Sequence, residues 1–133
     1  MVKSLLARFV SDLRQVVTDG VAQKQAIDRV FSMIATGTRG RGYVADFYRA
    51  NLPYTRAEKE IVSVEIISVL PISEQTYQIE WEETSRNING EVQSRTRWKA
   101  AATIATNPPK DEPTIRSNPI GVYIVDLNWT QTL

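Results

Sequence analysis

The chain has 133 residues, the size of one ordinary domain, and its 42% hydrophobic and 23% charged residues are typical of a folded globular protein. A formal net charge of +1 is too small to gather nucleic acid along the whole surface, and the absence of cysteine and histidine excludes disulfides, thiol chemistry and the commonest metal ligand. Since no apolar run reaches the ~18 to 20 residues that cross a bilayer, we expect one domain over 1–133 without a membrane span of its own.

Two amphipathic helices are predicted at the N-terminus. In residues 2–18 the apolar positions recur at three- and four-residue spacing. They are Val2, Leu5, Leu6, Phe9, Leu13 and Val16. Asp19-Gly20 ends this helix, and Asp19 is a suitable N-cap for a second helix, in which Ile27, Val30, Phe31 and Ile34 repeat the spacing.

A glycine-rich stretch follows, from Thr36 to Gly42 (TGTRGRG). Its three glycines and two arginines favour an exposed, mobile loop. It lacks the Lys-Ser/Thr ending of a phosphate-binding P-loop and follows no predicted strand, so we interpret it as a plain linker. A third helix is then predicted from Tyr43, Val44, Phe47 and Tyr48, and Asn51-Leu52-Pro53 ends it.

From Ile61 the hydrophobic period changes to two and indicates a strand that Pro71 closes. Val62, Val64 and Ile66 alternate with polar residues, but Ile67, Val69 and Leu70 are one step out of phase. Such a change of phase predicts a β-bulge near Ile66-Ile67.

Asn89-Gly90 is the strongest local signal, because this dipeptide favours a two-residue hairpin turn. Such a turn pairs Ile88 with Glu91, so that opposed residue numbers sum to 179. One face then carries the pairs Trp81 with Trp98, Ile79 with Ala100 and Tyr77 with Ala102, and the other carries Glu82 with Arg97 and Glu80 with Lys99. A slip of one residue would lose every match.

The last strand is predicted after a polar loop from Asn107 to Asn118. Tyr123, Val125, Leu127 and Trp129 are expected to share one of its faces. The element order therefore predicts an α+β fold, with three N-terminal helices packed on an antiparallel sheet of about four strands.

Few residues are suited to catalysis. Asp46, Asp126, Tyr43, Tyr77 and Tyr123 are the acid–base groups that could line a concavity between sheet and helices, but no spacing pairs them. Asp126 is expected on the strand face opposite Tyr123. The favoured interpretation is that the tyrosines belong to the core and the aspartates cap helices or face solvent.

Arg95, Arg97 and Lys99 form a basic row on the outer face of the predicted hairpin. An RNA-binding sheet would carry such a row with exposed aromatic residues between the charges. Here Glu80 and Glu82 lie across the strand and no exposed aromatic interrupts the row. A self-neutralising surface ladder is therefore the better interpretation, and DNA contact is possible but not supported by the sequence.

Asn118-Pro119-Ile120-Gly121 describes a tight turn that presents one apolar side chain, Ile120, just ahead of a strand. This turn is either a simple entry to the strand or a rigid loop suited to contacting another protein.

Four segments together resemble TrbF and its relatives, the assembly proteins of type IV secretion (conjugation) systems. They are FVSDLRQVVTDGVAQKQAIDRVF, VEIISVLPISEQTYQIEWEET, RTRWKAAATI and NPIGVYIVDLNW, and the likeness runs from about Phe9 to Trp129. Its most specific part is the NPxG turn at Asn118, Pro119 and Gly121. The chain departs from the family in having glycine at position 20, where relatives are expected to have proline.

The resemblance implies an NTF2-like fold, a strongly curved antiparallel sheet packed on helices, in a non-catalytic scaffold without cofactor or metal. It implies the periplasmic domain of a single-pass inner-membrane protein whose membrane helix is missing from this chain. The expected partners are a second copy in a weak homo-oligomer and other channel subunits, with Asn118, Pro119, Ile120 and Gly121 as the contact loop. The alternative is an NTF2-like enzyme or small-molecule-binding module that uses the cone between sheet and helices.

Overall fold

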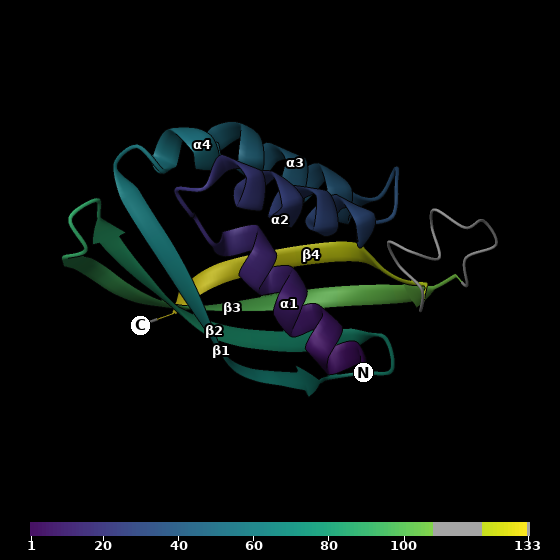
Figure 1. Ribbon diagram of the computed structural model, residues 1–133. Coiled ribbons are helices and arrows are strands. Elements are labelled where there is room, and N and C mark those ends of the chain that lie inside the picture. The colour runs from purple at the N-terminus through teal and green to yellow at the C-terminus, as the bar shows by residue number, and fades with distance from the viewer. Residues whose placement is uncertain (108–120, 133) are drawn as a thin grey trace.

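Helices pack against one face of a curved antiparallel sheet in the computed structural model, which describes residues 1–107 and 121–132 (Figure 1). The helices are α1 (Val2–Arg14), α2 (Gly20–Ser32), α3 (Arg39–Ala50) and the single turn α4 (Pro53–Arg56). The strands are β1 (Glu60–Pro71), β2 (Thr76–Asn87), β3 (Val92–Thr106) and β4 (Val122–Thr132), in the spatial order β1-β2-β3-β4. The predicted α+β architecture is confirmed, and α4 is an additional short helix.

The first helix is shorter than its apolar spacing predicts. It ends at Arg14, and Gln15 already has extended backbone angles. Val16 then pairs with Val62 of β1 through two backbone hydrogen bonds of 3.0 Å. Val16 is fully buried in this extended position. The prediction of a helix to residue 18 is wrong because pairing with the sheet edge satisfies this segment's backbone better than another helical turn.

The predicted start of the second helix is confirmed. The Asp19 carboxylate accepts hydrogen bonds from the backbone N–H groups of Val21 and Ala22, at 2.9 and 3.2 Å. These two donors have no partner within the helix, so the cap stabilises its first turn.

The glycine-rich stretch is not the loop that we predicted. Helix α3 begins inside it at Arg39, and the Thr38 hydroxyl accepts a hydrogen bond from the N–H of Arg41. Gly40 is buried against β4, where a Cβ would lie 3.2 Å from the backbone of Val125 and Asp126. This glycine therefore allows a close approach of helix and strand, a function that local turn propensity does not reveal.

Strand β1 carries the predicted bulge. Its register against β2 shifts between Ile66 and Ser68. Ile66 and Val69 on either side of the bulge both pack against the core, whereas Ile67 is 45% exposed. The extra residue thus reconciles the two phases of the apolar pattern.

The register of the β2–β3 hairpin is confirmed from Thr76 to Ser85, including the pairs Trp81 with Trp98 and Glu82 with Arg97. The two-residue turn is wrong. The register shifts by one residue after Ser85, and the Asn87 carboxamide accepts hydrogen bonds from the N–H groups of Asn89 and Glu91 at 3.0 Å each. Gly90 has a φ of 88°, so the turn is wider and needs a left-handed residue at that position.

The face assignment in the last strand is also wrong in part. Register shifts between β3 and β4 at Val125, so Ile124 and Leu127 both face the core although they lie three residues apart. As a result Tyr123 and Asp126, which oppose Ala105 and Thr103 of β3, lie on the same outer face. A regular strand would have placed them on opposite faces.

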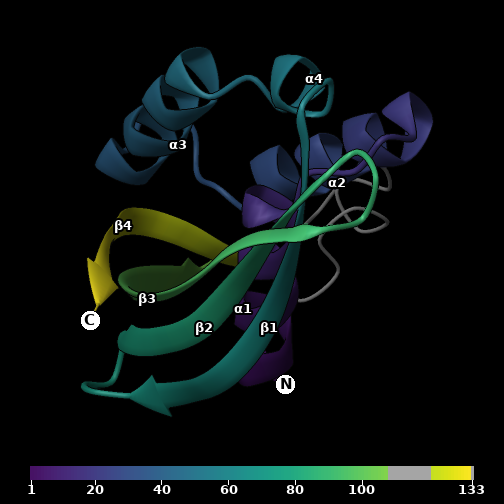
Figure 2. The ribbon, with the colours of Figure 1, turned by 90° about the vertical axis from the view of Figure 1, so that its left-hand side faces the viewer.

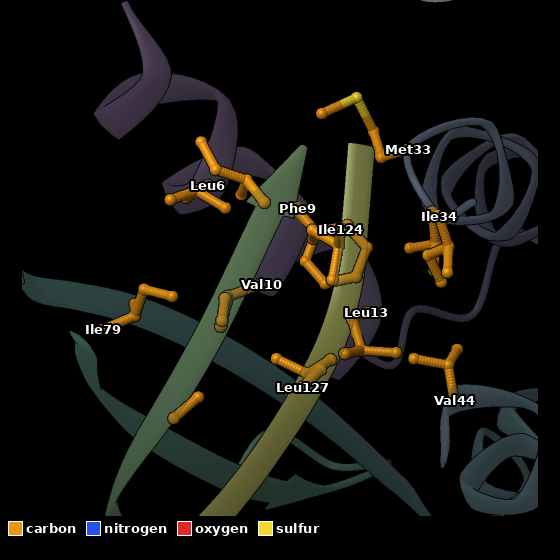
Figure 3. Close-up of a cluster of buried hydrophobic side chains, with 14 of the residues drawn as sticks. Leu6, Phe9, Val10, Leu13, Met33, Ile34, Val44, Ile79, Ile124 and Leu127 are labelled. Atoms are coloured by element: carbon orange, nitrogen blue, oxygen red, sulfur yellow. The ribbon is translucent and has the colours of Figure 1, made fainter. Parts of the chain in front are cut away.

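The core lies between α1 and the inner face of the sheet. Figure 3 shows side chains of α1 and of the sheet directed toward one another, among them Val10, Leu13, Ile79 and Leu127. Small residues Ala100 and Ala102 on β3 leave the room that the helix fills. Figure 2 shows how strongly the sheet curves around this core.

Candidate functional site

The space between sheet and helices is filled by side chains around Arg14, at the end of α1. Its guanidinium donates two hydrogen bonds to the Glu83 carboxylate of β2, at 2.5 and 3.1 Å, and the indole N–H of Trp81 donates to the same carboxylate at 2.8 Å. Both charged side chains are more than nine-tenths buried. Arg14 and Trp81 thus occupy both oxygens of the buried Glu83 carboxylate on the sheet side of α1.

Three aromatic rings surround the same guanidinium. The distances from its central carbon to the ring centroids are 4.3 Å for Trp98, 5.0 Å for Phe47 and 5.3 Å for Trp129. Phe47 comes from α3, and the two tryptophans come from β3 and β4. We call Arg14, Glu83 and the rings of Trp81, Trp98, Trp129 and Phe47 the arginine cluster. It joins helices and sheet by cation–π contacts and one buried ion pair.

The predicted acid–base residues do not meet. Asp46 is an exposed residue paired with Arg49 at 2.8 Å. Asp126 lies 3.3 Å from Arg39 at the surface. The Tyr43 hydroxyl accepts a hydrogen bond from the backbone N–H of Trp129 at 3.4 Å. These groups have structural partners of their own, and Tyr77 and Tyr123 are half-buried at other points of the sheet.

A shallow groove lies between α1 and α2, on the side of α1 away from the arginine cluster. Its volume is about 80 Å³, and its lining consists of Leu5, Arg8, Phe9, Asp12, Arg29, Ser32 and Met33. Asp12 is buried and accepts two hydrogen bonds of 2.9 Å from Arg29. The hydrogen bond with Asp12 raises the pKa of Arg29. This pair joins the two helices and leaves 41% of the Arg29 side chain exposed to solvent.

Of the predicted contact loop, Asn118, Pro119 and Ile120 lie outside the described residues. Gly121 is described: it is buried, and its φ of 69° is in the left-handed region that favours glycine. Its carbonyl accepts a hydrogen bond of 2.7 Å from the N–H of Asn107. This bond links the residue after β3 to the residue before β4, and we call Asn107 and Gly121 the neck of the β3–β4 connection.

An open groove of about 240 Å³ adjoins this neck. It is lined by Ile34, Ala35, Thr36, Ala105, Asn107, Tyr123 and Val125. Its helix-side wall is fixed to the sheet, because Ile124 and the segment from Met33 to Ala35 exchange backbone hydrogen bonds of 2.8 and 3.0 Å. The neck and the groove adjoin on one surface, where Ile34, Ala35 and Val125 supply apolar lining.

The basic row on the outer sheet face is partly neutralised, as predicted. Arg97 lies 3.5 Å from Glu82, and Lys99 is directly opposite Glu80 in the register. This part of the sheet presents paired charges and not a continuous positive field.

The sequence analysis missed Arg14, Glu83, Asp12 and Arg29. Glu83 could have been found, because the hairpin register places every odd-numbered residue from 77 to 83 on the inner face, and a glutamate beside two tryptophans needs a buried partner. Nothing in the sequence identified Arg14 as that partner, since the two residues are 69 positions apart.

No three His, Cys, Asp or Glu side chains in residues 1–107 and 121–132 gather as metal ligands would. Within the same ranges, none of the helices has both the length and the apolar character that crossing a membrane requires.

Comparison with known proteins gives one family and a set of similar structures. The family model described as "VirB8 protein" matches residues 1–132. The conjugal transfer protein TrbF of Rhizobium radiobacter is 37% identical over 133 residues, which are all of this chain and 60% of that relative. The chain therefore spans about three-fifths of the length of this curated relative.

Solved structures share the fold at low sequence identity. A TrwG component of the type IV secretion system of Bartonella birtlesii superposes with a TM-score of 0.80 at 12% identity, over 98% of this chain and 90% of that chain. The VirB8 protein of Agrobacterium tumefaciens superposes with a TM-score of 0.78 at 16% identity, over the same shares of the two chains.

Proposed function

Because this chain belongs to the VirB8 protein family, we propose that it is a periplasmic scaffold domain of a type IV secretion channel for conjugal DNA transfer. In this function it binds neighbouring subunits and a second copy of itself, and it catalyses no reaction. Two similar proteins support this proposal: the 37% identical relative is a conjugal transfer protein, and the TrwG structure is that of a type IV secretion system component.

The observation that carries the proposal is the filled interior. An enzyme or ligand-binding module of this fold would need a hollow between sheet and helices with a reactive group at its base. The arginine cluster occupies that position, and its carboxylate is held in an ion pair with Arg14. The outer surfaces are then the parts of the domain left for function, and they act by contact with other proteins.

We place the main contact at the neck of the β3–β4 connection and the adjoining groove. Gly121 in its left-handed conformation and the bond from Asn107 give the connection a fixed exit. Asn118, Pro119 and Ile120 belong to this proposed surface by their position in the sequence. A fixed exit reduces the entropy that binding would otherwise cost, so a modest interface can be specific.

Ile120→Asp in the protein of a donor strain tests this contact. We expect loss of DNA transfer and of binding to other channel subunits in a two-hybrid assay, because a charge replaces the apolar anchor. Ile88→Asp is the matched control, since Ile88 is 63% exposed in the turn between β2 and β3, away from the proposed contact. Gly121→Val is a poorer probe, because its backbone strain would also lower stability. Transfer and binding at the level of the control would show that the loop is not the contact.

We further propose that the domain faces the periplasm and that a membrane helix precedes it in the complete protein. Alkaline phosphatase, which is active only after export, can be fused after Leu133 in the complete protein. We expect an active fusion, and an inactive fusion with normal expression would contradict the proposed orientation.

A further inference from the structure

The sheet has two outer strands, β1 and β4, and the chain itself covers the edge of β4. Ile124 exchanges backbone hydrogen bonds with the segment after α2, at 2.8 Å to Met33 and 3.0 Å from Ala35. Farther along, the N–H of Trp129 donates to the hydroxyl of Tyr43 on α3. Helix α3 also packs along this strand at Gly40. The edge of β4 is thereby closed to a further strand at both ends.

The edge of β1 is covered only at its beginning. Val16 and Val62 exchange two backbone hydrogen bonds, so the outward groups of Val62 are satisfied. Because outward-facing residues alternate along a strand, the N–H and C=O groups of Val64 and Ile66 point to the same side. Within the described part of the chain, no backbone hydrogen bond reaches β1 from that side after Val62. Figure 2 shows β1 as the outermost strand, opposite β4.

The side chains along this open stretch are unusually apolar for a surface. Ile67, Leu70 and Ile72 are 45%, 51% and 59% exposed and lie within six residues. Glu65 is the only charged residue between Val62 and Ile72. Charged residues, bulges and prolines all protect open edges; here the bulge and Pro71 are accompanied by Glu65 as the one charge between Val62 and Ile72, so the aliphatic stretch remains open to a further strand.

We infer that residues 64–70 of β1 form a second contact surface, on which the same stretch of a second copy adds as an antiparallel strand. This inference extends the proposed scaffold function and uses a different part of the molecule from the β3–β4 neck. The stretch complements itself: about a two-fold axis near Ile67 and Ser68, Glu65 faces the apolar Leu70 end of the second copy and not that copy's glutamate. Symmetric pairing uses the open β1 edge of each copy, so that association ends at a dimer and does not continue into fibres.

Two features limit the strength of this pairing. The bulge at Ile67 interrupts the regular ladder, and Pro71 has no N–H to donate. Only a short stretch can therefore pair, and the contact should be weak and reversible, as suits a subunit that assembles and rearranges.

Single cysteines test the inference cleanly, because the chain has none of its own. About this axis Ile67 of one copy lies opposite Ser68 of the other, and directly opposed residues of an antiparallel pair are about 4.5 to 5.5 Å apart, within the range of a disulfide. We expect Ile67→Cys and Ser68→Cys chains, mixed in equal amounts, to give a covalent dimer of the two on mild oxidation, whereas Ile67→Cys mixed with the more exposed Ile88→Cys gives none. Absence of a dimer above the Ile88→Cys level would overturn the inference.

A second experiment introduces a charge at the edge of β1. Leu70→Glu in both chains of this mixture should abolish the crosslink, because the new carboxylate of each copy would face Glu65 of the other, and Ile88→Glu should leave it unchanged. An unchanged crosslink with Leu70→Glu, or crosslinking in donor cells only to a different protein, would overturn pairing with a second copy. Ile120→Asp should not alter the crosslink, so failure at this edge and failure of the proposed loop contact are distinguishable.

Discussion

Two ion pairs extend from the same helix in opposite directions, and their surroundings differ. Arg14 and Glu83 are enclosed on the sheet side of α1, with both side chains less than 10% exposed. Asp12 is equally buried, but its partner Arg29 is 41% exposed in the open groove toward α2. Each pair has two hydrogen bonds, and the two pairs differ in solvent access. On its sheet side, α1 therefore holds an ion pair from which solvent is excluded. On the side that faces α2, the ion pair includes an arginine that contacts solvent.

The largest expected effect is on the enclosed pair. Glu83→Ala leaves the Arg14 guanidinium buried without a counter-charge, which should lower the free energy of unfolding by about 3 to 5 kcal/mol. Urea unfolding at neutral pH measures this change. The double variant Arg14→Met with Glu83→Leu should recover most of the loss, because an apolar pair of similar volume needs no counter-charge. A double variant as unstable as the sum of the single variants would show that the charges themselves stabilise the fold.

Asp12→Ala should have a smaller effect. Arg29 can turn its guanidinium to water when its partner is removed, so the loss is limited to the hydrogen bonds and amounts to about 1.5 to 3 kcal/mol. The same unfolding experiment compares it with Glu83→Ala. Equal losses for the two variants would contradict the claim that solvent access separates the pairs.

Two glycines of α3 test how the sheet side of α1 is kept closed, because α3 contributes Phe47 to the arginine cluster on that side. Gly40→Ala places a Cβ 3.2 Å from the β4 backbone and should cost about 1 to 3 kcal/mol by forcing helix and strand apart. Gly42→Ala meets nothing within 4 Å in the exposed part of the same helix, so it should stabilise by about 0.5 to 1 kcal/mol. Thermal unfolding should show opposite shifts, and acrylamide should quench tryptophan fluorescence more strongly in the Gly40 variant only.

Glu60 extends the series to a pair with Arg56 in which the two side chains are 27% and 25% exposed, and it gives the smallest effect. Although burial opposes its ionisation, hydrogen bonds from Ser85 and Arg56 lower the pKa of this carboxyl below the ordinary value of 4.5. A lowered pKa in the folded state means that the stabilisation is present above pH 4.5 and is lost as the pH falls through the folded-state pKa.

The stabilisation by Glu60 should be no more than about 1 kcal/mol, since solvent screens the pair with Arg56. Glu60→Gln should therefore lower the melting temperature slightly at pH 7 and by less at pH 3. An equal difference at both pH values would indicate that packing, and not charge, is responsible.

Much of the fold could be predicted from neighbouring residues alone. The apolar spacing predicted three helices, the change of phase at Ile66-Ile67 predicted the bulge in β1, and the identity of opposed residues predicted the β2–β3 register, all of which are confirmed. The likeness to a secretion family was also visible in the sequence, and the match to the VirB8 family over residues 1–132 confirms it. Each of these features depends on residues close together in the chain or in one hairpin.

The remaining features depended on contacts between distant segments. Helix α1 ends at Arg14 because Val16 finds a partner on β1, and Gly40 lies in a helix because β4 requires a close approach. Arg14 meets Glu83 only once α1 is packed across the sheet. Periodicity records which face of an element is apolar, but not which element will cover it. That choice is made by packing in three dimensions, and it decided both the closed interior and the open edge of β1.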